Sequence, residues 1–524
     1  MSSPCRRPNG GVTLSRSPGR PSPIDRLPYD MLAAIFHEYM LMEWHSPEAK
    51  RLPNSGLFKW LRVSHVNKSW REVALHLRSL WSHIALPCRN PDLLDMLLSR
   101  SKNSPLHIRL LALWTHSRAR DLSFDLIQRN SQRLATLEVQ LNSDFRDPPL
   151  WHKFITEGLE NTPLLTRCSL EILNDLAPNR TAKLELKSAP ECRHIRHLVM
   201  GSLPFSIVKE FCRPTLMTLS ITYGEENVSI SALLSVLSTM SSLKELSVRP
   251  PDPFTTNPIM ELSHTECKDV VLPRLTSLRL SSDLPGSSIL LYHLVIPSTT
   301  NYEIEIGEED PTHFLEVLGR KLQGTKTIGD KRPPLKCGQL TAPTDNTFTI
   351  VWRAWATDVT FEGEFLPKDT PVLCIRLSDN YHDFRPDVVS FFSNLALSEV
   401  ETLHIIHAKR RFTSDSWHSF FTLTPNLQDL SVTGSSTSLR RIFQAMSPKA
   451  KPEESGTILI PQLHTLAVGY GARKTTDDAM IVEELRSTLE ARMPFRSTTH
   501  KFVISGLSDV LKMGRFEALR KWVD

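Results

Sequence analysis

The chain has 524 residues, of which 40% are hydrophobic and 23% charged, and its 62 lysines and arginines nearly balance its 57 aspartates and glutamates. This composition is typical of a globular protein long enough for more than one domain, and it offers no clustered basic face for nucleic acid. Because no run of 18 apolar residues and no apolar signal core occurs, we expect no membrane partner and a protein of the cytoplasm, the nucleus or both.

Residues 1–22 are rich in serine, proline, arginine and glycine and have almost no apolar side chains. A segment of this kind cannot bury enough surface to fold, so we expect a disordered basic tail. The eight cysteines of the whole chain are scattered without a C-x-x-C pair. This spacing predicts reduced thiols, with neither disulfides nor a zinc site.

Residues 23–86 have the apolar spacing of two amphipathic helices joined by a polar stretch. Pro28 stands where the first helix should begin, because a proline at the first helical position loses no hydrogen bond. The apolar positions of the two helices are Met31, Leu32, Ile35, Phe36, Tyr39 and Met40, then Val66, Trp70, Val73, Ala74, Leu77, Leu80, Trp81 and Ile84. So small a unit is near the lower limit for burying its own core, and part of the stripe is expected to need a partner.

In the order and spacing of these residues the segment resembles the F-box, the adaptor-binding module of cullin–RING ubiquitin ligases. The link over residues 41–60 is longer than the family usually has, and Asn67 stands where the family often has a cysteine. The resemblance implies that ten residues bind the adaptor or support that contact: Leu27, Pro28, Leu32, Ile35, Phe36, Val63, Val66, Trp70, Leu80 and Trp81. An apolar stripe at helical spacing is otherwise usually only core.

Residues 87–506 contain a repeat of the form P-x-L-x-x-a-x-a, in which a is any apolar residue. Five copies begin at Pro163, Pro214, Pro273, Pro425 and Pro461, and five without the proline begin at Leu134, Ile195, Leu243, Val372 and Val400. The alternation predicts a short strand with one buried face. Helical patterns precede several copies, over residues 151–161, 205–212, 230–240 and 415–423. Strands joined through helices run parallel, so we expect an α/β solenoid.

This array resembles leucine-rich repeats, in a degenerate form. Only two copies carry the family's asparagine, at Asn142 and Asn380, and the repeat spacing is irregular. Residues 250–269, 324–347 and 447–456 are polar and are expected to be loops. Within residues 282–365, the stretches 302–306 and 359–365 resemble strands without the leucine frame, and whether they continue the array stays open. Residues 507–524 predict a C-terminal capping helix.

The sequence offers little sign of catalysis. It contains no nucleophile elbow, phosphate-binding loop or zinc-protease motif. His194 and His197 would lie on opposite faces of a predicted strand and could not share a metal, and His404 and His407 fit ordinary strand positions. We therefore expect a protein that is not an enzyme and has no metal or cofactor.

A binding face is the better candidate. Alternate strand positions should line one face of the array with charged and polar side chains: Glu138, Gln140, Glu245, Arg249, Arg279, Arg376, His404 and Asp429. Mixed charge suits a protein or peptide better than a polyanion, although a merely solvated face remains an alternative for each residue.

The resemblances together imply the substrate-recognition subunit of an SCF-type ligase, in which the F-box holds the adaptor, and through it the cullin, while the repeats hold a protein substrate. Two alternatives stay open. One is a repeat scaffold without a role in ubiquitin transfer; the other is a nucleic-acid binder that uses Lys68 and Arg71.

Overall fold

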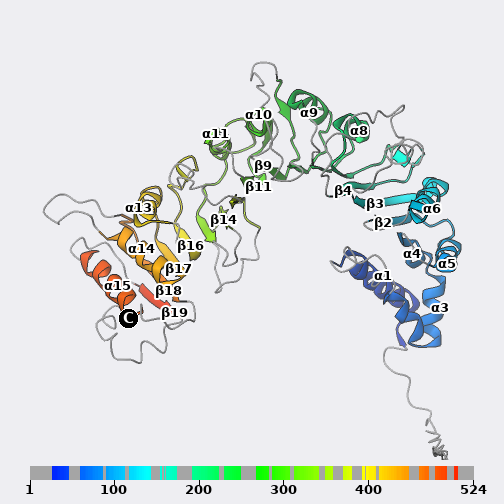
Figure 1. The fold of residues 1–524 in the computed structure, drawn as a ribbon, viewed down its shortest axis with the longest axis horizontal. Helices are drawn as coiled ribbons and strands as arrows, with labels where there is room; N and C mark the ends of the chain where they lie inside the picture. Colours follow the sequence, from blue (N-terminus) through cyan, green and yellow to red (C-terminus); the bar gives the residue numbers. More distant parts are fainter. Residues whose placement is uncertain are drawn as a thin grey trace, which may run out of the picture. The chain divides into compact units, whose positions relative to one another are not determined.

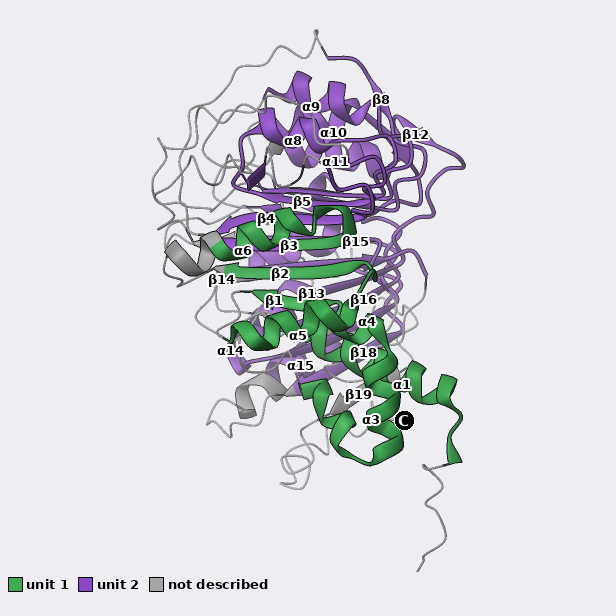
Figure 2. Ribbon diagram, turned by 90° about the vertical axis from the view of Figure 1, so that its right-hand side faces the viewer, with its two compact units in different colours: residues 1–137 green, residues 138–524 purple. Residues whose placement is uncertain are grey.

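The computed structural model describes residues 26–46, 59–86, 90–112, 117–142, 154–155, 159, 161–173, 192–222, 229–249, 267–281, 286–306, 312–341, 348–357, 370–379, 392–395, 397–408, 412–447, 459–470, 478–492 and 501–505. The chain divides into two compact units, Met1–Leu137 and Glu138–Asp524, here called the N-terminal and C-terminal units (Figure 2). The predicted tail, the stretch 359–365 and the predicted capping helix lie outside the described residues.

The N-terminal unit begins with a group of helices and continues with strands that alternate with further helices (Figure 1). Its elements are α1 (Tyr29–His45), η2 (Lys59–His65), α3 (Lys68–His76), α4 (Arg78–Trp81), β1 (His83–Leu86), α5 (Pro91–Ser101), β2 (Leu106–Ala112), α6 (Ser117–Arg129), η3 (Ser131–Arg133) and the start of β3 (Leu134–Asn142). Helix α1 packs against η2, α3 and α4. The two predicted helices therefore exist as α1 and α3, with η2 and α4 as short additions.

The first helix begins one residue later than its sequence predicts. Pro28 is the N-cap of α1, with φ −58° and extended ψ, and its carbonyl oxygen accepts hydrogen bonds from the backbone of Met31 and Leu32, each at 3.1 Å. The proline thus fixes the start of the helix from just outside it.

The end of the predicted helical segment is a strand. His83–Leu86 forms β1, which pairs in parallel with β2, so that Ile84 lies opposite Ile108. All four residues of β1 are buried. A strand of this kind is covered on both faces, and its continuous apolar run cannot be distinguished by periodicity from the end of a helix.

The C-terminal unit is of α/β type, with one large and mostly parallel sheet. Its strands are the rest of β3, β4 (Arg167–Leu173), β5 (His197–Gly201), β6 (Thr218–Thr222), β7 (Glu245–Arg249), β8 (Val270–Val271), β9 (Ser277–Ser281), β10 (Leu294–Pro297), β11 (Asn301–Ile306), β12 (Thr327–Ile328), β13 (Cys337–Thr341), β14 (Phe348–Trp355), β15 (Leu373–Asp379), β16 (Thr402–Ala408), β17 (Asp429–Gly434), β18 (Thr465–Tyr470) and β19 (Lys501–Ser505). Its longer helices are α8 (Phe205–Phe211), α9 (Ile230–Leu237), α10 (Ser287–His293), α11 (Thr312–Leu322), α13 (Ser414–Thr422), α14 (Ser436–Met446) and α15 (Asp478–Arg492).

All ten copies of the leucine repeat contain a strand, as predicted. The residues of the leucine frame are buried, as Leu219 and Ile221 are in β6, and most of their alternate neighbours are partly exposed. Cys374 of β15 and His404 of β16 are alternate neighbours that are buried. The helices predicted over 205–212, 230–240 and 415–423 are α8, α9 and α13. Of the helix predicted over 151–161, only four residues are described. The helices lie along one face of the large sheet (Figure 1), where the leucines form the core.

The prediction that all strands run parallel is wrong in the middle of the sheet. There the strand order is β9-β11-β15-β14-β13-β16, and β14 runs antiparallel to both of its neighbours. Residues 324–347, predicted to be a loop, contain β12 and β13, whereas residues 302–306 form a strand as their alternation predicts. The region 282–365 therefore does continue the sheet, through an antiparallel meander as well as parallel strands. A second small sheet has the order β12-β10-β8.

A glycine fixes the packing of this meander. A Cβ atom on Gly338 of β13 would lie 2.3 Å from Cη2 of Trp352 on β14. The Trp352 ring is buried and packs edge-on against Phe392 and Phe420, at centroid distances of 5.3 and 6.2 Å. Because the indole has no free space to move into, only glycine fits at residue 338.

Replacing Gly338 with alanine should therefore lower the free energy of unfolding of the C-terminal unit by about 1–3 kcal/mol, the usual cost of overpacking a core. Urea denaturation followed by circular dichroism would measure the loss. A second change, Trp352→Leu, removes the clashing ring, so the double variant should lose less than the sum of the two single variants. Additive losses would show that the ring and the new methyl group do not compete for space.

Candidate functional site

Helix α1 is apolar on two faces. One face is buried in the N-terminal unit through Leu32, Phe36, Met40 and Trp44. On the other face Met31, Ile35 and Met42 have 53%, 45% and 72% of their surface exposed. These three residues follow the i, i+4, i+11 spacing of a single stripe on a helix. A stripe of large apolar side chains left open to water is typical of a protein-binding surface.

Aromatic side chains hold the buried face together. The rings of Phe36 and Trp70 lie 5.1 Å apart, as do those of Trp60 and Trp81. The indole Nε1 of Trp81 donates a hydrogen bond to the carbonyl oxygen of Ala74 at 2.9 Å. The guanidinium of Arg100 lies 4.3 Å from the Trp81 ring centroid. Trp81 therefore connects η2, α3 and α5 through three kinds of contact.

The ten residues predicted to bind an adaptor fall into three groups by exposure. Pro28, Ile35 and Val66 are exposed, Val66 by 56%; Leu27, Val63 and Trp70 are partly exposed; Leu32, Phe36, Leu80 and Trp81 are buried. The last four are buried and offer no surface to a partner, so of the two roles that the prediction allows they fit support rather than contact. Their role is to support the exposed ones. The prediction did not include the exposed Met31 and Met42, although Met31 belongs to the same apolar pattern.

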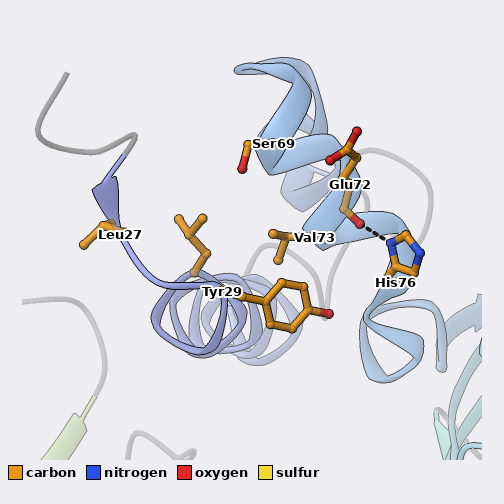
Figure 3. A pocket seen from close by; sticks show the side chains of 7 residues that line it. Leu27, Tyr29, Ser69, Glu72, Val73 and His76 are labelled. Atoms are coloured by element: carbon orange, nitrogen blue, oxygen red, sulfur yellow. Dashed lines mark hydrogen bonds between the residues drawn. The ribbon is translucent and has the colours of Figure 1, made fainter. Parts of the chain in front are cut away.

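A hollow of about 480 Å³ opens beside the start of α1 (Figure 3). Its apolar lining comes from Leu27, Tyr29, Leu32 and Val73, and its polar lining from Ser69, Glu72 and His76 on α3. Nδ1 of His76 donates to the backbone carbonyl of Glu72 at 2.7 Å, and the exposed Glu72 carboxylate lies 3.9 Å from Nζ of Lys68. The hollow could receive an apolar side chain of a partner that also presents a hydrogen-bond donor or a cation.

Asn67 fixes where α3 begins, directly after the exposed Val66. Its side-chain oxygen accepts a hydrogen bond from the backbone N–H of Trp70 at 2.8 Å. Nε of Arg71 donates to the carbonyl oxygen of Ser64 at 3.0 Å, which ties α3 back to η2. Asn67 is thus the N-cap of this helix.

The variant Asn67→Ala should lower the free energy of unfolding of the N-terminal unit by about 1 kcal/mol, because the first turn of α3 loses its cap. Asn67→Asp keeps an oxygen acceptor at the same place and should lose almost nothing. Chemical denaturation of both variants would measure the difference. Equal losses for alanine and aspartate would contradict a capping role.

His83 on β1 is enclosed by other rings. It stacks on His107 of β2 at a centroid distance of 4.3 Å and meets the edge of Trp44 at 5.2 Å. Burial, with the positive charge of His107 as the second cause, lowers the pKa of His83 to about 3. His83 is therefore neutral at physiological pH.

Arg109 on β2 is a buried charge that is held at the end of α1. Its Nη1 donates to the carbonyl oxygen of Trp44 at 2.9 Å, and its guanidinium lies 4.4 Å from the Trp44 ring centroid. A cation suits this place because the C-terminus of a helix carries a partial negative charge. Arg109 thus links the end of α1 to the β1–β2 pair.

The C-terminal unit presents its polar strand positions on the sheet face opposite the helices, here called the open face. Of the residues predicted to line it, Arg279 and Arg376 form ion pairs with two carboxylates, Glu303 and Glu305, and Arg249 lies on β7, the strand beside that of Arg279. The others lie apart from this group. Glu138 and Gln140 are on β3, Glu245 is exposed on β7, Asp429 is partly exposed on β17, and His404 is only 5% exposed on β16. His404 is a correction to the prediction, since it offers a partner almost no surface.

Ion pairs join these charges across three neighbouring strands. Arg279 lies 3.3 Å from Glu303 and 2.6 Å from Glu305, and Arg376 lies 3.1 Å from Glu303. Glu303 and Glu305 were missed as site residues, although the alternation of residues 302–306 placed them on the same face. Arg353 on β14 was also missed, because the meander that brings it here was not predicted.

Metal ligation finds no support in the described residues, among which no group of three or more His, Cys, Asp or Glu side chains could hold an ion. His197 begins β5, whereas His194 lies in the turn before it. The prediction that both histidines lie on one strand is therefore wrong. In the same part of the chain, no helix is both long and apolar enough to cross a membrane.

Comparison with known proteins assigns no relationship: no protein-family model matches the sequence, and no curated protein shows significant similarity to it. The argument for function therefore depends on the two surfaces described above.

Proposed function

We propose that this chain is the substrate-recognition subunit of an SCF-type cullin–RING ubiquitin ligase, whose N-terminal unit binds the adaptor and whose C-terminal unit binds a protein substrate. The observation that carries the proposal is the exposed apolar stripe of α1. A helix that is apolar on both faces, with only one face packed in its own unit, is costly in water unless a second protein covers the other face. The order of apolar residues in this segment resembles the F-box, which supports an adaptor as that protein.

The proposed adaptor contact consists of Pro28, Met31, Ile35 and Val66, together with the hollow beside α1. Met31 and Ile35 lie on α1, Pro28 directly before it, and Val66 between η2 and α3. Aromatic packing and the Asn67 cap hold these elements in place. Because these residues are already held in place, binding does not carry the entropy cost of ordering them first. The catalytic steps of ubiquitin transfer would belong to other subunits, and this chain would act by holding a substrate close to them.

Co-expression with the adaptor and cullin tests this proposal. The wild-type chain should retain both proteins in a pull-down, and Ile35→Asp or Val66→Asp should lose them, because each places a charge in a contact that excludes water. Both side chains are exposed, so neither change should unfold the unit. Leu122→Asp is a matched control: Leu122 is 62% exposed on α6 of the same unit but is outside the proposed contact.

If the wild-type chain does not retain the adaptor, the alternative of a repeat scaffold without a role in ubiquitin transfer is favoured.

The contacts of α3 argue against the alternative of a nucleic-acid binder. Lys68 lies 3.9 Å from Glu72, and Arg71 donates to a backbone carbonyl, so both predicted cations already have partners.

A further inference from the structure

We propose that the open face of the C-terminal unit binds an extended protein segment that carries two carboxylates about six residues apart. The inference rests on the proposed function only in naming this segment a substrate. The binding itself follows from the charges on β7, β9, β11, β15 and β14, and it can be measured without the adaptor.

The register of the strands places the relevant side chains in two adjacent rows. One row runs Ser247, Arg279, Glu303, Cys374, Arg353 and Gln339; the other runs Ser281, Glu305, Arg376, Val351 and Thr341. Arg249 continues the second row on β7, because it follows Val248, which lies opposite Leu280. The two rows hold four arginines and two glutamates, an excess of two positive charges. Glu245, one row further along β7, accepts a hydrogen bond from Thr218 at 3.3 Å. The rows therefore attract an anionic partner.

The two glutamates already have their cations. Glu303 is shared by Arg279 and Arg376, and Glu305 pairs with Arg279. No ion pair is recorded for Arg249 or Arg353 in the described structure, and Arg353 Nη1 donates only to the neutral side-chain oxygen of Gln339, at 3.2 Å. The excess charge thus belongs to the two arginines at opposite ends of the cluster.

Hydrogen-bond donors are also in excess here. Nε of Arg249, Arg279 and Arg376 is buried without an acceptor in the protein. Gln339 is fully buried. Its side-chain oxygen accepts a hydrogen bond from Arg353, but its Nε2 has no acceptor. A buried donor without an acceptor is costly. These buried atoms are out of a ligand's reach, so the carboxylates of a ligand would instead meet the guanidinium groups of Arg249 and Arg353, whose side chains are partly exposed.

The positions of Arg249 and Arg353 indicate the shape of the ligand. They are on β7 and β14, four strand spacings apart, which is about 19 Å along the sheet. One phosphate group cannot reach both arginines. An extended peptide rises about 3.3 Å per residue, so two carboxylates about six residues apart could meet one arginine each.

Fluorescence anisotropy with synthetic peptides tests this inference on the full chain. The probe is a labelled peptide with blocked ends, in which two glutamates are separated by five serines and threonines. It should bind at least about tenfold more tightly than the same peptide with glutamines, and the difference should shrink as salt is raised. Moving the glutamates to adjacent positions should weaken binding, because only one arginine can then be reached.

Protein variants identify the site. Arg249→Ala and Arg353→Ala should each weaken the glutamate peptide about tenfold, and Arg249→Lys should restore part of the loss. Arg274→Ala is the matched control, because Arg274 is an exposed arginine of the same unit that lies in the turn before β9. Circular dichroism should show the fold of each variant to be intact. Ile35→Asp, which is designed to abolish adaptor binding, should bind the peptide normally.

Three results would overturn the inference. These are equal binding of the glutamate and glutamine peptides, binding that neither Arg249→Ala nor Arg353→Ala weakens, and tight binding of a peptide with a single phosphoserine where the two-glutamate peptide does not bind. The last result would assign the site to a phosphate. None of these results concerns the adaptor contact, so the proposed function would still be decided by the pull-down with the adaptor.

Discussion

Replacing Trp81 with alanine should lower the free energy of unfolding of the N-terminal unit by about 3–5 kcal/mol, as is usual when a buried tryptophan is truncated. Trp81 is 2% exposed and touches Trp60, so its removal leaves a large cavity between η2 and α4. The change also removes the partner of the Ala74 carbonyl oxygen and the ring beneath Arg100. Urea denaturation, followed by tryptophan fluorescence and circular dichroism, measures the loss.

Trp81→Phe separates these contributions. Phenylalanine keeps an aromatic ring against Trp60 but cannot donate to Ala74, so the loss should be smaller than that of Trp81→Ala. If alanine and phenylalanine cost the same, packing around Trp60 contributes little and the hydrogen bond dominates. A loss below about 1 kcal/mol for alanine would contradict the central role given to Trp81 in this unit.

The stability of the N-terminal unit should fall as the pH drops below about 6.5, in part because of His83. The folded-state pKa of His83 is about 3. Between that value and the unfolded-state value of about 6.5, the unfolded chain binds a proton that the folded chain does not. The neutral histidine thus contributes its full stability above pH 6.5, and roughly 2 kcal/mol of it should be lost by pH 5 and roughly 3 kcal/mol by pH 4.

His83→Phe isolates this contribution, since it keeps a ring between His107 and Trp44 but cannot be protonated. His37 and His45, whose charges also lower the pKa of His83, remain in both proteins. As the pH falls from 7 to 5, the free energy of unfolding should decrease more in the wild type than in the variant. Parallel pH profiles for the two proteins would show that His83 is not buried as a neutral group.

Local patterns in the sequence were sufficient to predict many of the elements. The leucine frame predicts each of the ten strands in which it occurs, because one buried face requires alternation whatever lies beside it. The two N-terminal helices follow from apolar spacing, with Pro28 marking the start of one. The meander of β13, β14 and β15 does not follow, because strand order depends on pairings between distant residues that periodicity does not record.

The candidate sites were predicted in part for the same reason. The spacing in α1 identifies Ile35 and Phe36 as apolar positions, but it cannot tell which is buried when both faces of a helix are apolar. On the open face, Arg279 and Arg376 were predicted as surface residues. Their connection through Glu303 depends on β11 lying between β9 and β15, which only the register of the folded sheet determines.

Titration of the purified adaptor into the full chain, followed by isothermal calorimetry, tests the central claim most directly. The account predicts a one-to-one complex for the wild type and for Leu122→Asp. It predicts binding at least about thirtyfold weaker for Ile35→Asp, since a charge placed at the centre of an interface removes one of its main contacts. No binding by the wild type, or equal binding by wild type and Ile35→Asp, would contradict the assignment of the exposed face of α1 as the adaptor contact.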